Sequence, residues 1–215
     1  MASYAKLEIT LITLIGATVT AAVGFFFGWW ALLPGILALS LLAFYRDPPR
    51  RITPGDNLVL SAADGRIMNV ERDFHVTPDA PAELRITIFL SVANVHINRA
   101  PCAGTVTGLE YNPGEFLNAL KSEATTRNEN NLVTFKPKAP LPGPILVRQI
   151  AGVLAKRVVC TAEPGDELAA GERFGMIKLG SQTEVRMPED PRWEVAVRPK
   201  QPVRAGVTVL TRLKT

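Results

Sequence analysis

The residues best suited to chemistry lie in the stretch GMIKLGSQTEV, which covers positions 175–185. Ser181 follows Gly180 there, so a nucleophilic hydroxyl stands beside a residue that tolerates strained backbone angles. This pairing suits an intramolecular N-to-O acyl shift, in which a serine hydroxyl attacks the peptide carbonyl that precedes it. The same residues also fit an ordinary strand with a glycine bulge. Other parts of the chain must decide between these two interpretations.

His96 is a candidate for the base that such a hydroxyl needs. It follows the strand-like run ITIFLS at 86–91 and precedes NRAP at 98–101, where a strand is expected to give way to a loop. Histidine titrates near neutral pH and can take a proton from a serine hydroxyl. A histidine among apolar residues also fits a purely structural role. The second histidine, His75, lies in a polar turn and is assigned no function.

Asp64 is the third polar candidate and lies in SAADG, at 61–65. An Asp-Gly pair between two strand-like runs is typical of a tight turn. A carboxylate can also hold an imidazole in one tautomer and stabilise its cation, as in the serine triads. The spacing of Asp64, His96 and Ser181 along the chain does not show whether they meet.

The elements that would position these residues are mostly strands. Beyond residue 54, short runs rich in branched residues are separated by glycine, proline and aspartate, which predicts a mainly β fold. The runs cover 58–61, 65–70, 83–90, 105–111, 132–135, 145–151, 153–161, 173–179, 193–197 and 207–210, with a helical turn or two expected at 116–121 and a loop at 128–131. Recurrent turns such as EPGD at 163–166 resemble those of the barrel-sandwich folds of lipoyl and biotinyl carriers. Lys178 lies in a strand pattern rather than at a hairpin tip, so it does not match a carrier lysine.

An uncharged segment, residues 9–45, precedes the β region. One helical crossing of a bilayer needs about 20 apolar residues, so this segment is long enough for two short helices. The sequence GFFFGWWALLPG at 24–35 interrupts it, and a tryptophan pair is typical of a membrane interface. We therefore predict a helical hairpin, with a shallow re-entrant hairpin left open. Lys6 on one flank and a stiff linker at 46–54, with three arginines and three prolines, favour the cytoplasmic side for both ends.

Composition narrows the class of partner. The net charge of +4 and a pI near 9.3 suit either an anionic membrane surface or nucleic acid. Aromatic residues are concentrated in the N-terminal segment and do not alternate with basic residues, so nucleic acid is not expected as a partner. Cys102 and Cys160 lie far apart without paired spacing, which argues against a zinc site and suggests reduced thiols in a domain that faces the cytosol.

Four stretches, in order along the chain, carry a resemblance to one known family. They are YRDPPR at 45–50, ADG at 63–65, VHINRAP at 95–101 and GMIKLGS at 175–181. Together they resemble the short, membrane-anchored form of phosphatidylserine decarboxylase. In that family the proenzyme cuts itself between the glycine and the serine, and the serine becomes an N-terminal pyruvoyl group.

The resemblance implies a role for each candidate. Asp64 and Ser181 match two members of the family's self-processing triad, and His96 is the candidate for the third. Cleavage is expected between Gly180 and Ser181, so the implied cofactor is a covalent pyruvoyl group derived from Ser181, with no metal. Its ketone would form a Schiff base with phosphatidylserine and act as an electron sink while carbon dioxide leaves. Protonation by His96 would then give phosphatidylethanolamine.

This chain departs from the family's pattern in two places. Longer members have threonine after the Leu-Gly-Ser at the cut, where this chain has Gln182. They also have a second histidine three residues after the first, where this chain has Arg99. Whether His96 serves both self-cleavage and decarboxylation is therefore open. Asn98, Arg99 and Lys178 are candidates for substrate binding.

These observations predict a membrane-anchoring helical hairpin at 1–46 and a β-rich, barrel-sandwich-like catalytic domain at 47–215. The expected partners are phosphatidylserine, an anionic lipid surface and the two self-cleaved chains as a heterodimer, with a higher oligomer left open. The expected location is the cell membrane, with the catalytic domain on the cytoplasmic side. Two other classes fit part of the pattern. One is a non-catalytic, membrane-tethered barrel-sandwich adaptor, and the other is a hydrolase that uses Ser181, although the sequence contains no Gly-X-Ser-X-Gly elbow around it.

Overall fold

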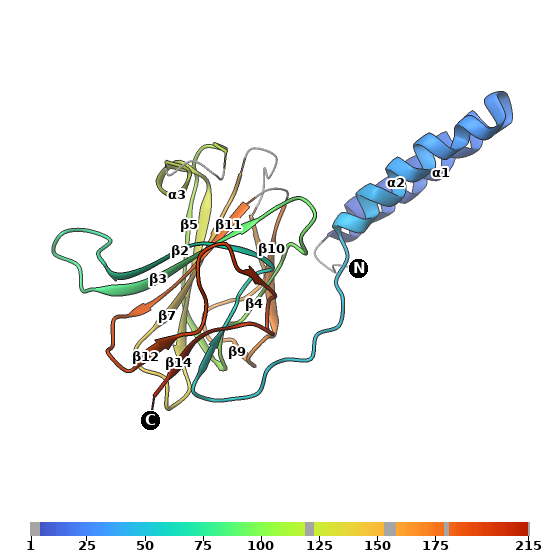
Figure 1. The fold of residues 1–215 in the computed structure, drawn as a ribbon. Coiled ribbons are helices and arrows are strands. Elements are labelled where there is room, and N and C mark those ends of the chain that lie inside the picture. Colours follow the sequence, from blue (N-terminus) through green and yellow to red (C-terminus); the bar gives the residue numbers. More distant parts are fainter. Residues whose placement is uncertain (1–4, 119–122, 153–157, 179–180, 215) are drawn as a thin grey trace. The chain divides into compact units, whose positions relative to one another are not determined.

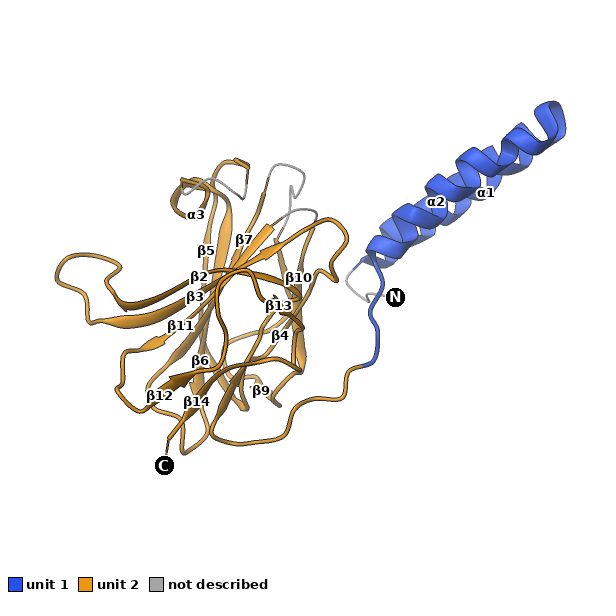
Figure 2. Ribbon diagram, in the orientation of Figure 1, with its two compact units in different colours: residues 1–49 blue, residues 50–215 orange. Residues whose placement is uncertain are grey.

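The computed structural model of the chain describes residues 5–118, 123–152, 158–178 and 181–214. The chain divides into two compact units, residues 1–49 and residues 50–215, which Figure 2 shows in different colours. The first unit is helical and the second is built mostly from strands. The prediction of a mainly β chain with an N-terminal apolar helical hairpin is confirmed.

The helical unit is a hairpin of two apolar helices. Helix α1 covers Lys6–Phe27 and helix α2 covers Leu32–Phe44, and a short 3-10 helix at Gly28–Ala31 joins them. Figure 1 shows α1 and α2 side by side. The joining segment contains the tryptophan pair, whose rings stack with centroids 4.3 Å apart. The segment Lys6–Phe44 is long and apolar enough to cross a membrane, and none of its most apolar window is buried within the structure.

Small residues let α1 and α2 approach each other closely. A Cβ atom added to Gly16 would lie 2.6 Å from the Cβ atom of Ala38, so a larger residue would push the helices apart. Eight residues further along α1, a Cβ atom on Gly24 would already contact Ala31 at 3.4 Å. Small residues spaced four apart, here Gly16, Thr20 and Gly24, are typical of packed membrane helices. Close packing of these small residues therefore stabilises the hairpin, in addition to the apolar character of its two helices.

The strands of the second unit form one large sheet and two small sheets. They are β1 Leu58–Leu60, β2 Gly65–Phe74, β3 Glu83–Leu90, β4 Ile97–Arg99, β5 Gly104–Asn112, β6 Asn130–Pro137, β7 Ile145–Ile150, β8 Val158–Cys160, β9 Glu167–Leu168, β10 Arg173–Ile177, β11 Ser181–Pro188, β12 Trp193–Val195, β13 Pro202–Val203 and β14 Val209–Leu213. The eight-stranded antiparallel sheet has the order β13-β2-β3-β11-β7-β6-β5-β9 and curls into a half-barrel (Figure 1). The small sheets have the orders β1-β14-β12 and β4-β10-β8.

The structure differs from the predicted elements after β5. The helix expected at 116–121 is not present at 116–118, and a short helix, α3, instead covers Ala124–Arg127. The side chain of Asn128 both donates to and accepts from the backbone of Leu117, at 2.8 Å each, which holds this backbone away from helical hydrogen bonding. The loop expected at 128–131 is also partly wrong, because β6 begins at Asn130. Residues 119–122, and residues 153–157 of the strand expected at 153–161, lie outside the described part of the chain.

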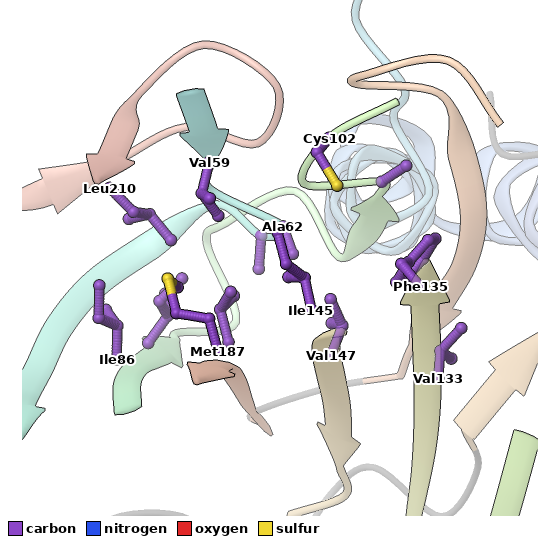
Figure 3. Close-up of a cluster of buried hydrophobic side chains, with 14 of the residues drawn as sticks. Val59, Ala62, Ile86, Cys102, Val133, Phe135, Ile145, Val147, Met187 and Leu210 are labelled. Atoms are coloured by element: carbon purple, nitrogen blue, oxygen red, sulfur yellow. The ribbon is translucent and has the colours of Figure 1, made fainter. Parts of the chain in front are cut away.

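The core packs the large sheet against the sheet that contains β1 and β14. Alternate residues of β3 from Leu84 to Leu90 are completely buried, as the two-residue period of a strand requires. Met187 of β11 belongs to the same cluster, which Val59 and Leu210 join from the small sheet (Figure 3). Burying each such aliphatic side chain stabilises the fold by about 1.5–3 kcal/mol. This core holds β3 and β11 rigidly side by side.

Cys102 provides a test of how tightly this core is closed. Burial raises the pKa of the Cys102 thiol to about 12, so at pH 8 only about one molecule in 10⁴ carries the reactive thiolate. We expect iodoacetamide to leave Cys102 unmodified in the folded protein and to modify it after unfolding in urea, as measured by peptide mass. Cys160 is only partly buried and is the matched control, which we expect to react faster. Equal rates at the two thiols in the folded protein would contradict the packing described here.

Candidate active site

Ser181 is the first residue of β11 and is completely buried. Its backbone lies opposite Leu90, the last residue of β3. Within the described part of the chain, the Ser181 Oγ atom is a buried hydroxyl that makes no hydrogen bond. A buried polar atom without a partner is costly, and a catalytic role is one explanation for such an atom. Gly180, the other residue of the predicted cleavage site, lies outside the described residues.

His96 is completely buried and immediately precedes β4. Its Nδ1 atom lies 2.9 Å from the backbone carbonyl oxygen of Asn94. Because a carbonyl oxygen can only accept a hydrogen bond, this contact places a proton on Nδ1. A neutral His96 ring then has its lone pair on Nε2, which is the state that a general base requires.

The turn before His96 holds the carbonyl group that orients the ring. The side-chain Oδ1 atom of Asn94 accepts hydrogen bonds from the backbone N–H and the hydroxyl of Ser91, at 2.8 Å and 2.7 Å. The Asn94 N–H in turn donates to the Ser91 carbonyl at 2.9 Å. Asn94 is not among the residues predicted from the sequence, although serine and asparagine are both common in turns.

The backbone brings His96 and Ser181 to one region of the fold. The N–H of Ile177, at the end of β10, donates to the carbonyl of His96 at 3.1 Å. Ser181, four residues later, pairs with Leu90, six residues before His96. Residues 177 and 96 are therefore in contact, and so are residues 181 and 90, so the two segments of chain between them begin and end at neighbouring positions. His96 thus contacts Ile177, four residues before Ser181, and Ser181 pairs with Leu90 where β3 ends.

Asp64 is buried in the turn between β1 and β2, but its hydrogen bonds in the described structure do not go to an imidazole. Its Oδ2 atom lies 2.7 Å from the Nη2 atom of Arg50, and its Oδ1 atom accepts a hydrogen bond from the Ala205 N–H at 2.8 Å. Gly65 is required after it, because a Cβ atom there would lie 2.1 Å from the carbonyl oxygen of Phe89. The pairing of Asp64 with His96 stays a prediction.

The turn that carries Asp64 does lie against the strand that follows His96. The carbonyl of Ala62 accepts hydrogen bonds from the backbone N–H of Arg99 at 3.0 Å and from the side-chain amide of Asn98 at 3.3 Å. These contacts fix the Asp64 turn beside β4. The acid and the histidine are thus carried by adjoining segments.

The three predicted substrate-binding residues occupy different environments. Asn98 is completely buried, and Arg99 is buried with its Nη1 atom donating to the carbonyl of Gly171 at 3.0 Å. Lys178 is partly buried and stands at the edge of the described residues, after β10. Their binding of substrate stays a prediction, and the structure adds that Asn98 and Arg99 have partners inside the protein.

A buried polar chain links β4 to the strand that carries Ser181. The Asn98 amide donates to Thr183 Oγ1 at 3.2 Å, and the Gln149 amide donates to Asn98 Oδ1 at 2.9 Å. The Asn131 amide continues the chain by donating to Gln149 Oε1 at 3.1 Å. Buried networks of satisfied polar groups rigidify the segments that they join. These residues come from four different strands, so their contacts could not be predicted from their positions along the chain.

Glu184 lies on the opposite face of β11 from Ser181, because successive strand residues point to opposite sides. It is almost completely buried, and its carboxylate lies 3.4 Å from Arg85 and 3.8 Å from Arg148. Burial raises the pKa of Glu184, while these arginines act against that rise. Within the described ranges, no three His, Cys, Asp or Glu side chains converge as they would around a metal ion.

Comparison with known proteins adds a further finding. The model of a protein family described as phosphatidylserine decarboxylase matches residues 37–211. Several relatives carry the name phosphatidylserine decarboxylase proenzyme. The relative from Rhodopirellula baltica is 42% identical over 210 residues, covering 95% of this chain and 85% of its own. The relative from Symbiobacterium thermophilum is 45% identical over 205 residues, covering 93% of this chain and 92% of its own. The relative from Syntrophus aciditrophicus is 38% identical over 207 residues, covering 96% and 95%.

Proposed function

Because this chain belongs to the phosphatidylserine decarboxylase family, we propose that it makes its own pyruvoyl group from Ser181 by breaking the peptide bond after Gly180. Its activity is the conversion of phosphatidylserine to phosphatidylethanolamine and carbon dioxide, as a pyruvoyl-dependent carboxy-lyase. The family match favours this activity over the alternatives of a non-catalytic adaptor and a serine hydrolase. The observation that carries the Ser181 proposal is the buried Oγ atom, which is engaged in no hydrogen bond within the described residues.

Self-cleavage would proceed through an ester. The Ser181 hydroxyl adds to the Gly180 carbonyl and the C–N bond breaks, so that Gly180 is esterified to the Ser181 oxygen and residue 181 carries a free amine. Removal of the Cα proton of residue 181 then expels the Gly180 carboxylate from Cβ and leaves dehydroalanine. Addition of one water and loss of ammonia convert dehydroalanine to the pyruvoyl group. Both chains, residues 1–180 and 181–215, are thereby accounted for.

His96 is the base that we assign to the first step. With Nδ1 held by the Asn94 carbonyl, Nε2 is the nitrogen that can take the proton of the Ser181 hydroxyl. The protonated ring can then return a proton at a later step. Asp64 is assigned the role of the acid that stabilises the charged imidazole, from the turn beside β4.

The described residues fit a pyruvoyl group at position 181, since a buried site at the start of β11 is shielded from water. When formed, the group supplies an electron sink for the carbanion that appears as carbon dioxide leaves. We propose that His96, whose backbone carbonyl contacts Ile177 four residues before that position, holds the proton that the product carbon receives. We assign His96 both proton transfers, because Arg99 stands where longer family members have a second histidine.

The two chains produced by cleavage should stay together as a heterodimer. Strand β11 belongs to the smaller chain and pairs with both β3 and β7 of the larger chain. Strand β14, also in the smaller chain, pairs with β1. Removing a central strand would expose the core on both of its neighbours. We therefore expect the chains to separate only in denaturant.

The apolar hairpin associates the protein with the membrane that contains its substrate. We propose that the β domain lies on the cytoplasmic side, because Lys6 and the arginines of the 46–54 segment flank the hairpin. Protease treatment of sealed right-side-out and inside-out vesicles tests this orientation. Digestion of the β domain only in inside-out vesicles is the expected result.

Intact mass spectrometry of purified wild-type protein tests the proposed processing. We expect two chains, of 180 and 35 residues, that divide after Gly180. The smaller chain should lack a free amino terminus and should gain mass on treatment with borohydride and phosphatidylserine. A single uncut chain with full activity would contradict the proposal.

Asn94 should affect self-cleavage through the turn that it closes. Asn94→Ala removes the acceptor for the Ser91 N–H and hydroxyl and loosens the carbonyl that orients His96. We expect self-cleavage to slow by about tenfold, a fraction of the 10²–10⁴ that a general base supplies. A time course of uncut chain after synthesis measures this rate.

Two further variants test whether the effect comes from the turn. Asn94→Asp keeps both acceptor contacts and should cut faster than Asn94→Ala. Asn69→Ala is the matched control, because the side chain of exposed Asn69 also accepts a hydrogen bond, from the N–H of its neighbour Val70. Equal cleavage rates in Asn94→Ala and Asn69→Ala would remove Asn94 from the site.

A further inference from the structure

The strongest charged contact of the predicted triad is made to a residue outside it. Arg50 Nη2 lies 2.7 Å from Asp64 Oδ2, and each of the two side chains is only 11% exposed. The other carboxylate oxygen of Asp64 accepts from the Ala205 N–H at 2.8 Å. Both oxygens of the acid are therefore held, one by a cation and one by the backbone. Arg50 thus has a specific partner inside the domain, whereas an arginine that only faced lipid headgroups would lie exposed.

The segment around Arg50 is itself fixed by the domain. Thr53, three residues later, donates its backbone N–H to the Gly206 carbonyl at 3.1 Å and its hydroxyl to the Val207 carbonyl at 2.6 Å. Ile52 packs so closely that a Cβ atom on Gly206 would lie 2.8 Å from its Cδ1 atom. This is the same turn that supplies the Ala205 N–H to Asp64. The turn at 204–208 and the segment around Arg50 therefore pack against each other, and each supplies one partner of the Asp64 carboxylate.

We propose that Arg50 is a positioning residue for self-cleavage, which balances the buried charge of Asp64 and fixes its carboxylate in the turn beside β4, where its charge can stabilise the protonated His96 ring. This inference rests on the proposed function, in which Asp64 is the acid of the self-cleaving site. A buried carboxylate that loses its cation must turn toward water, take up a proton or rearrange its surroundings. Each of these outcomes removes a fixed acid from the site. The residue that prevents them belongs to the segment between the membrane hairpin and the first strand.

Variants of the full-length chain separate this role from simple packing. Arg50→Gln removes the cation, and Arg50→Lys keeps the charge without the planar fork of the guanidinium. Arg51→Gln, at the exposed neighbouring position, controls for loss of basic charge near the membrane. Thr53→Ala loses a hydrogen bond of the same segment without touching Asp64. The rate of self-cleavage is followed by intact mass, and thermal unfolding is recorded for each substitution combined with Ser181→Ala.

We expect Arg50→Gln to slow self-cleavage by about tenfold or more, as losing a charge-assisted hydrogen bond would. Arg50→Lys should cut at an intermediate rate, and Arg51→Gln and Thr53→Ala should cut within about threefold of wild type, as for positions outside the network. If Arg50→Gln does not fold, the self-cleavage rate of Arg50→Lys tests the proposal instead. Slower cutting by folded Arg50→Lys supports the proposal, and cutting at the wild-type rate overturns it.

Other outcomes overturn the inference without touching the assignment of the enzyme. One is self-cleavage by folded Arg50→Gln at the wild-type rate or faster. The other is a loss of rate in Thr53→Ala as large as that in Arg50→Gln, which would show that the effect comes from packing of the segment. Normal cutting by Asp64→Asn would remove Asp64 from the site, and the role of Arg50 would fall with it, while cleavage at Ser181 stands. Only an uncut, active wild-type chain would remove the proposed function itself.

Discussion

Ser181→Ala should yield a single 215-residue chain with no measurable decarboxylase activity. Alanine has no oxygen to attack the Gly180 carbonyl, so neither the cut nor the pyruvoyl group can form. The loss of activity should exceed about 10⁴-fold, because an electrophilic ketone that supplies the electron sink has no substitute among protein side chains. Intact mass measures the cut, and release of carbon dioxide from carboxyl-labelled phosphatidylserine measures the activity.

Ser181→Cys is the matched variant. Cysteine supplies a nucleophile at the same place, and elimination from its thioester leaves the same dehydroalanine and the same pyruvoyl group. We therefore expect slow cutting, and the material that is cut should be active. Both variants place a small side chain at a fully buried position, so the fold should be kept. A cut after Gly180 in Ser181→Ala, or activity in its uncut chain, would refute the assignment of Ser181.

His96→Ala should accumulate mostly uncut chain, with self-cleavage slowed by at least about 10²-fold, as expected when a general base is removed. The substitution also empties a buried site, so loss of the fold is a competing cause of a slow cut. His96→Gln addresses this, because its longer side chain fills more of the buried site than alanine and its amide can form hydrogen bonds, yet it offers no basic nitrogen. We expect His96→Gln to fold and still to fail in self-cleavage.

His75→Ala is the control for His96. His75 is exposed and its Nδ1 atom also contacts a backbone carbonyl, that of Ala80, at 2.7 Å. It lies in the segment that joins β2 to β3, and the variant should cut and decarboxylate at the wild-type rate. Normal cutting by His96→Gln would limit His96 to a structural role.

The His96→Gln variant can also test separately the two proton transfers assigned to His96, one in self-cleavage and one in decarboxylation. Any cut chain that His96→Gln forms over days carries a pyruvoyl group and can be isolated and assayed per group. Loss of decarboxylation in that material would show that His96 serves the second reaction as well as the first. Full decarboxylation per pyruvoyl group would give the second proton transfer to another residue and confine His96 to processing.

Local sequence alone was enough to predict much of this protein. The uncharged segment at 9–45, broken near Trp29 and Trp30, predicted the helical hairpin, because length and hydropathy limit what such a segment can do. Branched residues alternating between turns predicted the mainly β unit. The Gly180-Ser181 step was compatible with an acyl shift and with a strand that has a glycine bulge, and the family resemblance carried by four stretches favoured the acyl shift. These features depend on residues that are close together along the chain.

What the sequence left undecided is how the polar groups are held. Asp64 meets Arg50 at a separation of 14 residues and Ala205 at a separation of 141. The partner that orients His96 is a backbone carbonyl. Every residue has one, so the residue type cannot identify this partner. The helix predicted at 116–121 is absent at 116–118 for a related reason, since the Asn128 side chain takes the hydrogen bonds of the Leu117 backbone.

The tertiary structure decided these partners because it sets distances that spacing along the chain does not encode. Pairing of β11 with β3 places Ser181 opposite Leu90, and the β4–β10 pair places His96 beside Ile177. A buried hydrogen bond is strong only when both groups are fixed within about 3 Å, and that precision comes from the packing of whole strands. The reactive residue types are therefore a local property of this chain, while their orientation is a property of the folded sheet.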